Sequence, residues 1–298
     1  MQAITSLFFS YEKNSEGLIQ TASLVTQGFS RMEPTLLSNK LNLKGDSMPL
    51  TPLGKAADYN NVPVKIGGRA MIVTFRPKEE EARKYIPNPL ELREPLGFAK
   101  VYQLVRQPVD EDLKFENPER TQYQEGAIGL AARYMGQNAQ YNVVNWVDQE
   151  DALIRGREVY GVPKKLGKVT MTKFSPIDKI GPGTQIKGMV ERHSDRIFTA
   201  SMKVKRQIEP SQVPKWGDFY HLRVIPSPDP DIPDIKQIVK LLVQNVQVSD
   251  AWEGEGTLTL HDSPNEELLP LAPVEVLGAY YFNLSWTLPT HGKVVHSY

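Results

Sequence analysis

The pattern of hydrophobic and polar residues changes close to Val64. Residues 1–62 mix Ser, Thr, Asn and Gln with scattered Leu and Phe, and they follow neither a helical nor a strand period. From Val64 onward, short apolar runs rich in Val, Ile, Tyr and Phe recur between turns that contain Pro and Gly. The pattern predicts an N-terminal extension over residues 1–62, either wrapped around the main body or flexible, and one folded domain over residues 63–298.

Strand-forming segments outnumber helical ones in the folded domain. Two short helices are expected, one opened by Pro77 with glutamates in its first turn and one from Asp148 to about Arg157. Residues 108–124 and 208–218 are expected to form loops. Strands are expected over residues 70–75, 97–106, 126–134, 139–147, 166–174, 184–193, 196–206, 219–225, 238–249, 256–262 and 274–288. These elements favour a mainly β (α+β) fold in which antiparallel sheets close into a barrel.

The composition narrows the classes of partner. The chain has 35 basic and 35 acidic residues and no cysteine. A net charge of zero gives no support for nucleic acid or a membrane surface as the partner, and it does little to oppose self-association. The lack of cysteine excludes disulfides, thiolate metal sites and cysteine nucleophiles. No apolar run approaches the roughly 18 residues of a membrane helix, and the N-terminus makes a poor secretory signal, so we expect a cytoplasmic protein.

Motifs for metal-dependent and phosphate-dependent chemistry are missing from the sequence. The five histidines form no His-Glu-x-x-His motif and no other close ligand pair. There is no Gly-x-Ser-x-Gly nucleophile elbow and no glycine loop for phosphate. We therefore expect neither a metal site nor an organic cofactor.

The most informative stretch covers residues 156–166, where Lys164 and Lys165 follow a Val-Pro step in a largely apolar setting. A free lysine has a pKa near about 10.4 and is a poor nucleophile while protonated, whereas burial or a neighbouring cation favours the neutral amine. On a strand the two lysines point to opposite faces, so we expect burial to contribute more than their mutual repulsion. One of the two would then form a Schiff base with a keto acid. The alternative is a pair of solvated surface charges.

Several motifs, in order along the chain, resemble the acetoacetate decarboxylase family. The resemblance extends from about Val64 to about Pro289. The central motif is Gly-Arg-Glu-x-x-Gly-Val-Pro-Lys-Lys-Leu-Gly at residues 156–167. The other motifs are Gly68-Arg69, the run from Ala82 to Glu91, Glu94-Pro95-Leu96, the run from Asp250 to Gly254, and Thr257-Leu258-Thr259-Leu260.

The resemblance implies roles for four charged side chains. Lys164 would be the Schiff-base nucleophile, a role for which acetoacetate decarboxylase is itself a known example, and Lys165 would be the perturbing cation. Arg69 would bind the substrate carboxylate, unless it pairs with a surface carboxylate. Glu125 would handle protons or orient the carbinolamine, unless it is an ordinary carboxylate at a strand end.

Two apolar neighbours of the lysines, Tyr160 and Val162, are expected to line the substrate pocket. Members of the family often have an aromatic residue at the position of Val162, so the smaller side chain favours a bulkier keto acid. They also often have an acidic residue shortly after the Glu-Pro-Leu segment, where this chain has Ala99 and Lys100. Both differences argue against acetoacetate itself as the substrate.

The resemblance also implies the architecture and the reaction. We expect a cone-shaped β barrel with a few short helices, assembled as a homo-oligomer, that takes a small keto acid as its partner. The expected reaction is decarboxylation of a β-keto acid through a lysine iminium and an enamine, which releases CO₂ and a ketone. Two alternatives remain: the same fold and iminium used for aldol, dehydration or cyclisation chemistry, and a non-catalytic barrel that binds an apolar ligand.

Overall fold

The computed structural model describes residues 41–108 and 112–298. Residues Leu43–Tyr298 form one compact unit. Part of the predicted extension belongs to this unit, because Tyr59 is buried and its hydroxyl group donates a hydrogen bond to Glu158 Oε2 at 3.1 Å. The rest of the predicted extension, up to residue 40, lies outside the described residues. Among the helices in the described part of the chain, none combines the length and the apolar character needed to cross a membrane.

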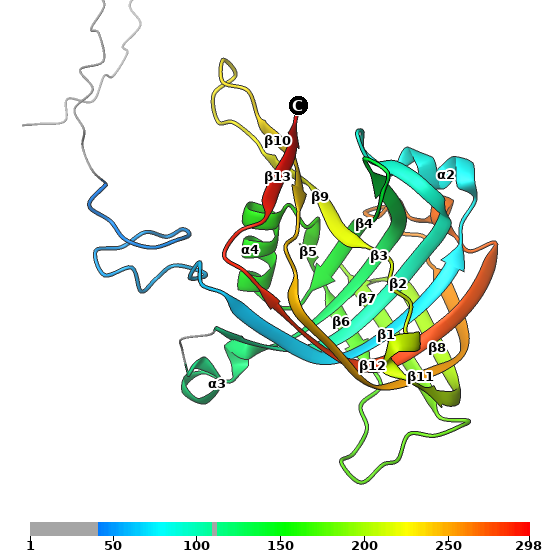
Figure 1. Ribbon diagram of the computed structural model, residues 1–298. Helices are drawn as coiled ribbons and strands as arrows, with labels where there is room; N and C mark the ends of the chain where they lie inside the picture. The colour runs from blue at the N-terminus through cyan, green and yellow to red at the C-terminus, as the bar shows by residue number, and fades with distance from the viewer. Residues whose placement is uncertain (1–40, 109–111) are drawn as a thin grey trace, which may run out of the picture. The chain divides into compact units, whose positions relative to one another are not determined.

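The described chain is dominated by strands, which confirms the mainly β prediction (Figure 1). The strands are β1 (Val64–Arg76), β2 (Glu91–Pro108), β3 (Gln122–Tyr134), β4 (Gln137–Val147), β5 (Lys164–Leu166), β6 (Lys168–Met171), β7 (Gln185–Arg192), β8 (Asp195–Ile208), β9 (Asp218–Ile225), β10 (Ile235–Lys240), β11 (Gln244–Leu260), β12 (Glu275–Leu288) and β13 (Lys293–Ser297). The helices are α2 (Glu79–Lys84), α3 (Leu113–Glu116) and α4 (Glu150–Tyr160), with single 3₁₀ turns at Glu119–Thr121, Pro210–Gln212 and Leu269–Leu271.

The strands of the described chain form one curled sheet in the order β13-β10-β9-β4-β3-β2-β1-β12-β11-β8-β7-β6, with β5 paired to β4 (Figure 1). The predicted closure into a barrel is corrected, because the hydrogen-bonded path stays open between β13 and β6. The curl instead brings the short strand β6 into contact with β2, β3 and β4. Most pairs are antiparallel, but β4 runs parallel to β5 and to β9. A helical crossover, here α4, is the usual connection between neighbouring parallel strands such as β4 and β5.

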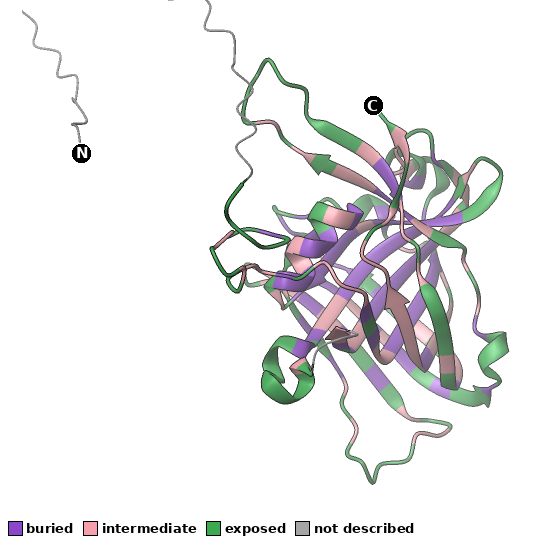
Figure 2. Cartoon of the chain, turned by 60° about the vertical axis from the view of Figure 1, so that its left-hand side comes forward, coloured by how far each residue is buried: buried purple, intermediate pink, exposed green. Residues whose placement is uncertain are grey.

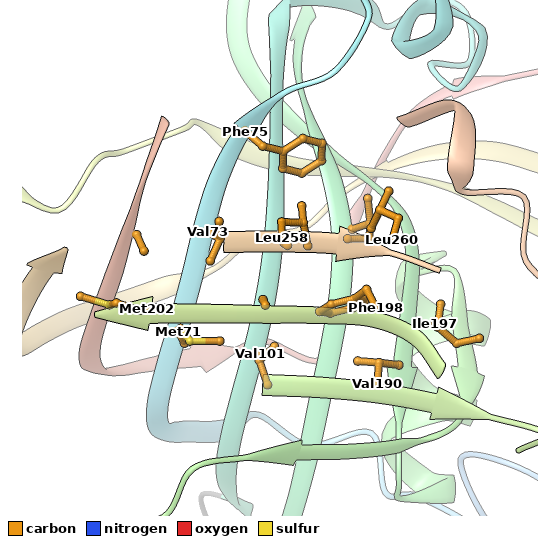
Figure 3. Packing of buried hydrophobic residues seen from close by; sticks show 14 of the residues in the cluster. Met71, Val73, Phe75, Val101, Val190, Ile197, Phe198, Met202, Leu258 and Leu260 are labelled. Carbon is orange, nitrogen blue, oxygen red and sulfur yellow. The ribbon is translucent and has the colours of Figure 1, made fainter. Parts of the chain in front are cut away.

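The main hydrophobic core fills the inside of the curl. Figure 3 shows Met71, Val73 and Phe75 of β1 on the same side as side chains of β7, β8 and β11. The neighbouring residues Ala70 and Ile72 point to the other face, because side chains alternate along a strand. Both faces of β1 are therefore covered, which explains the continuous apolar run that its sequence contains.

Helix α4 covers the second face of the sheet and positions the lysine motif. Its buried residues recur on one side of the helix, and Figure 2 shows them beside buried positions of the central strands. Glu150 and Asp151 in the first turn suit the positive end of the helix dipole. The helix ends at Gly161, whose φ of +69° is left-handed and whose place leaves only 2.7 Å between an added Cβ and the Arg223 backbone. The chain then turns through Pro163 into β5.

Candidate active site

A cavity of about 210 Å³ lies between the second face of the sheet and α4, β9 and the segment that joins β10 to β11. Its polar side comes from charged and amide side chains, and its apolar side comes from β12 and the segment after β10. On β2, residues 100, 102, 104 and 106 line the cavity while residues 99 and 101 pack in the core, as strand alternation requires. The lining residues are Val64, Ile66, Lys100, Tyr102, Leu104, Arg106, Tyr123, Glu125, Asn142, Asn145, Ala152, Arg155, Gly156, Tyr160, Val162, Lys164, Phe219, His221, Leu241, Val243, Val246, Leu284, Trp286 and Leu288.

Lys164 and Glu125 meet in this cavity. Lys164 is buried on β5, opposite Asn145 of β4, and its Nζ lies 2.9 Å from Glu125 Oε2. Asn145 Nδ2 donates to the other carboxylate oxygen, Oε1, at 2.6 Å. The amide thus fixes the carboxylate, and the carboxylate fixes the amine. A buried amine with a proton acceptor at hydrogen-bond distance is the arrangement that nucleophilic lysine chemistry requires.

Lys165 lies on the opposite face of β5, away from the cavity. Its Nζ donates to Glu266 Oε2 at 2.8 Å, and Arg192 Nη1 lies 3.6 Å from the other oxygen of the same carboxylate. Trp146, the strand partner of Lys165, donates to Glu266 through Nε1 at 3.2 Å. The structure therefore pairs Lys165 with a buried carboxylate and does not place it beside the Lys164 amine as a bare cation.

A second lysine, Lys100, occupies the cavity wall, a role that the sequence reasoning did not assign to it. It is almost completely buried, and its Nζ donates to Gln140 Oε1 at 2.7 Å and to Asn142 Oδ1 at 3.2 Å. The same nitrogen lies 4.7 Å from the centre of the Phe219 ring. Burial lowers the pKa of Lys100 to about 7, and the negative charge of Glu125 opposes this shift. The cavity thus contains a cation whose charge changes close to neutral pH.

His221 on β9 is a further cavity residue that the sequence did not reveal. The side chain is buried, and neither Nδ1 nor Nε2 has a hydrogen-bond partner among the described residues. Burial lowers the pKa of His221 to about 3, and the positive charges of Lys100 and Lys164 act in the same direction. The ring is therefore neutral at pH 7 and offers one donor and one acceptor.

The structure brings Arg155, rather than Arg69, to the cavity. Arg69 does not line it; it lies on β1 between Asn283 of β12 and Gln103 of β2. Arg155 is buried on α4, and its Nη2 donates to the carbonyl oxygen of Val62 at 2.8 Å.

Arg155 also contacts Tyr160, one of the two predicted pocket residues. Its Nη2 donates to Tyr160 Oη at 3.0 Å, and both Tyr160 and Val162 line the cavity. Its Nε has no hydrogen-bond partner, and within the described residues it forms no ion pair with a carboxylate. A buried guanidinium with an unused donor suits an anionic ligand.

The missed residues left only a weak trace in the sequence. Lys100 stands in a run of strand formers at a position that alternates with core residues, and Arg155 precedes the lysine motif by one residue. Neither residue can be placed in the cavity from the sequence alone, because its position depends on the pairing of distant strands or on the packing of α4. Together the cavity holds an amine, a carboxylate that can accept its proton, and an arginine suited to an acid group, which are the groups that imine chemistry on a keto acid needs.

Solved structures of other proteins have a similar fold. An acetoacetate decarboxylase-like enzyme from Sphingomonas wittichii RW1 superposes with a TM-score of 0.81 at 23% identity, over 86% of this chain and 100% of that chain. The enduracididine biosynthesis enzyme MppR, complexed with pyruvate, superposes with a TM-score of 0.79 at 27% identity, over 87% of this chain and 100% of that one. The first similarity supports the fold alone.

Comparison of sequences extends the similarity along most of the chain. An acetoacetate decarboxylase from Burkholderia mallei (strain NCTC 10229) is 26% identical over 267 residues, which cover 87% of this chain and 98% of the relative. The acetoacetate decarboxylase of Paraburkholderia xenovorans (strain LB400) is 28% identical over 231 residues, 76% of this chain and 84% of the relative. The family model described as acetoacetate decarboxylase (ADC) matches residues 47–298, and the chain belongs to this family.

Proposed function

We propose that this protein is a Schiff-base enzyme that decarboxylates a β-keto acid to CO₂ and a ketone. The observation that carries the proposal is the buried Lys164 amine, which faces the cavity 2.9 Å from Glu125. Membership of the acetoacetate decarboxylase family supports an enzyme that acts on a small keto acid. Val162 lines the cavity where members of the family often have a larger aromatic residue, and this favours substrates bulkier than acetoacetate.

The proposed reaction begins with transfer of a proton from Lys164 to Glu125. The neutral amine attacks the ketone carbon to give a carbinolamine. Glu125 then returns its proton to the carbinolamine hydroxyl group, which leaves as water and gives a positively charged iminium. The electron pair of the bond to the carboxylate flows into this iminium, so CO₂ leaves and an enamine remains. Protonation of the enamine carbon and hydrolysis then release the ketone and free Lys164.

Arg155 is the residue that we propose for the substrate carboxylate, in place of Arg69. Its buried position and its unpartnered Nε favour a charged hydrogen bond to an anion. The apolar side of the cavity, with Leu284 and Trp286, keeps water away and favours loss of the charged carboxylate as neutral CO₂. Arg106 is less suited to this role, because it already pairs with Asp151.

A second reaction starts from the same iminium. Loss of a proton beside the iminium gives an enamine that attacks an aldehyde, and the result is aldol or dehydration chemistry without release of CO₂. The specific observation that favours it is the similarity to MppR, which was solved with pyruvate and with the condensation product of pyruvate and imidazole 4-carboxaldehyde.

The decisive experiment traps the iminium with borohydride and identifies the adduct by mass spectrometry. We expect an adduct on Lys164 with acetoacetate or a longer β-keto acid, and no adduct in the variant Lys164→Met. Lys168→Met is the matched control, because the Lys168 side chain is 76% exposed. No adduct, or an adduct on Lys165, would contradict the proposal and leave binding of an apolar ligand as the alternative.

Release of CO₂ in the same reaction separates decarboxylation from aldol chemistry. Assays of acetoacetate against longer and aryl-substituted β-keto acids test the pocket size, and a clear preference for acetoacetate would contradict the bulkier substrate. The homo-oligomer and the cytoplasmic location stay predictions, which light scattering and fractionation would test.

A further inference from the structure

Several buried polar atoms without partners gather around the cavity. Within the described residues, they include Asn145 Oδ1, Arg155 Nε and both ring nitrogens of His221. Buried polar groups in folded proteins nearly always have a hydrogen-bond partner. The unpaired atoms at this one site therefore point to a ligand with several polar groups.

Arg155 and Lys100 are two separate cationic groups in the wall. Arg155 lies on α4, whereas Lys100 lies on β2, and in the described chain neither forms an ion pair with a carboxylate. Lys100 uses two of its three donors, on Gln140 and Asn142, so one N–H remains for a ligand. A lysine is rarely buried unless it is paired, so its location argues for an anionic partner from outside the chain.

The strand register shows how the two lysines relate to each other. Lys100 pairs with Ala127, Ala127 pairs with Asn145, and Asn145 pairs with Lys164. The lysines thus stand at the two ends of one row across β2, β3, β4 and β5, roughly 14 Å apart at their Cα atoms, from three strand spacings of about 4.8 Å. Both lysines line the same cavity. A ligand held covalently at Lys164 can therefore extend along the row toward Lys100.

His221 lines the same cavity, and its ring centre lies 5.9 Å from that of Phe219. Phe219 on the same strand packs near Lys100, with the Nζ 4.7 Å from the ring centre. The neutral imidazole can donate one hydrogen bond to an oxygen that Lys100 also binds.

We propose that Lys100 and His221 form a second carboxylate subsite, and that the substrate is a keto dicarboxylic acid. One carboxylate binds Arg155, the ketone carbon bonds to Lys164, and the distal carboxylate binds Lys100 and His221. The keto-acid chemistry at Lys164 rests on the proposed function, whereas the subsite itself does not require it. A cavity of about 210 Å³ has room for roughly seven water molecules, which is enough for a small organic acid.

The first test measures binding without any ketone chemistry. Glutarate and pentanoate have the same chain length and differ only in the second carboxylate. Titration calorimetry at pH 6.5 is expected to show glutarate bound more tightly than pentanoate. In Lys100→Met the affinity for glutarate falls roughly ten- to hundredfold, while the affinity for pentanoate changes less than about threefold. The exposed Lys168→Met serves as the control, with no change in either affinity.

The second test uses the trapped adduct. The matched pair is 3-oxopentanoate and 3-oxopentanedioate, and the measured quantity is the concentration that half-saturates borohydride trapping at Lys164. Lys100→Met is expected to raise this concentration roughly ten- to hundredfold for the dicarboxylate only. His221→Asn is expected to act in the same direction with a smaller effect. Lys100→Gln replaces Lys100→Met if the latter lacks the native near-ultraviolet circular dichroism.

The outcomes separate the two proposals. Equal binding of glutarate and pentanoate, or an equal effect of Lys100→Met on both acids of a pair, overturns the second carboxylate subsite and leaves the Schiff-base proposal intact. Selective loss of glutarate binding in a protein that yields no trapped adduct overturns the Schiff-base proposal and supports the subsite. Selective loss in both tests supports both.

Discussion

Glu125 makes two hydrogen bonds in the cavity, one to the Lys164 amine and one to the Asn145 amide. Replacement by Gln keeps the shape of the side chain but removes the proton acceptor. We expect Glu125→Gln to lower the rate of imine trapping at pH 7 by roughly 10²- to 10⁴-fold, which is the usual contribution of a general base. Single-turnover trapping with a saturating keto acid measures this rate directly.

The control for Glu125 is Glu255→Gln. Glu255 pairs with Lys205 on the surface, and its side chain is 68% exposed, so its loss is expected to leave the trapping rate unchanged. A purely structural role for Glu125 predicts a different result. In that case the Gln variant would unfold at a lower urea concentration yet trap the keto acid at the normal rate, which would rule out Glu125 as the proton acceptor.

His221 predicts a specific dependence of stability on pH. Its pKa in the folded protein is about 3, below the ordinary value of 6.5, because of burial and the nearby lysines. Between these values the unfolded state binds the proton and the folded state does not. Protonation of His221 in the unfolded state therefore lowers the free energy of unfolding as the pH falls from 6.5 toward 3. Above pH 6.5 this loss is absent.

The measurement compares urea unfolding at pH 7.0 and pH 4.5. The free energy of unfolding of the wild type is expected to fall by roughly 2–3 kcal/mol more than that of His221→Phe over this range. The matched change at the exposed His291, His291→Phe, is expected to leave the pH dependence of the wild type unchanged. Equal pH dependence of the wild type and His221→Phe would show that His221 titrates normally in the folded protein.

What the sequence revealed about the site follows from where its residues stand in the chain. Lys164, Val162 and Tyr160 lie within one short motif, so their proximity to each other was available from the sequence alone. Lys100 and His221 come to the cavity from β2 and β9, through pairings between segments far apart in the chain. The local sequence does not show which distant segments such residues will meet. Nothing in the sequence indicated that Lys165 pairs with Glu266, because the two residues are far apart in the chain.

At the scale of elements, the packing of α4 against β5 leaves little room around the lysine. A Cβ at Gly156 of α4 would come within 2.7 Å of Lys164 Cδ and 3.0 Å of its Cε. These atoms belong to a flexible side chain, so the fold can accommodate Gly156→Ala by moving the lysine. Alanine also favours a helix over glycine by about 1 kcal/mol. We therefore expect a folded variant of equal or greater stability in which the amine is displaced from Glu125.

The readout for Gly156→Ala separates stability from reactivity. A displacement on the order of 1 Å can cost about 10²-fold in rate, so we expect the trapping rate to fall at least about tenfold while the urea midpoint is retained. Gly181→Ala is the control, because no atom lies within 4 Å of an added Cβ there. Normal trapping by Gly156→Ala would show that the tight contact with α4 does not position the amine.

The strand predictions failed mainly where the local pattern lacked a boundary. Residues 238–249 form one apolar-rich run that predicts a single strand, but β10 ends at Lys240 and β11 begins at Gln244. The intervening segment supplies Leu241 and Val243 to the cavity wall. An apolar side chain that lines a cavity has the same sequence signature as one in a strand. Only the tertiary structure distinguishes the two.

For the whole molecule, the sequence predicted the class of fold but not that the sheet stays open. Alternation and turn residues gave the mainly β class, since both are local properties. The open path between β13 and β6, and the parallel pairing of β4 with β9, depend on contacts between segments that are distant along the chain. Residues 43–62 lack a period, yet the Tyr59 side chain and the carbonyl groups of Asp58 and Val62 contact the body of the protein.

Those contacts make a prediction about two shortened chains, one starting at residue 43 and one at residue 63. The chain from residue 63 loses the buried Tyr59 with its bond to Glu158, and it loses the carbonyl group of Val62 that accepts from Arg155. It also loses the carbonyl group of Asp58, which accepts from Arg120 at 3.2 Å. With about 1 kcal/mol for each hydrogen bond and about 2 kcal/mol for the buried tyrosine, we expect it to be less stable by roughly 3–5 kcal/mol than the chain from residue 43.

Urea unfolding of both chains measures this difference, and imine trapping shows whether it reaches the site. Because Val62 orients Arg155, the chain from residue 63 is also expected to need a higher keto-acid concentration for half-saturation. The chain from residue 43 keeps every one of these contacts and provides the reference for both measurements. Equal stability and equal half-saturation in the two chains would place the start of the folded domain at residue 63, as the hydrophobic pattern predicts, and would deny residues 43–62 a structural role.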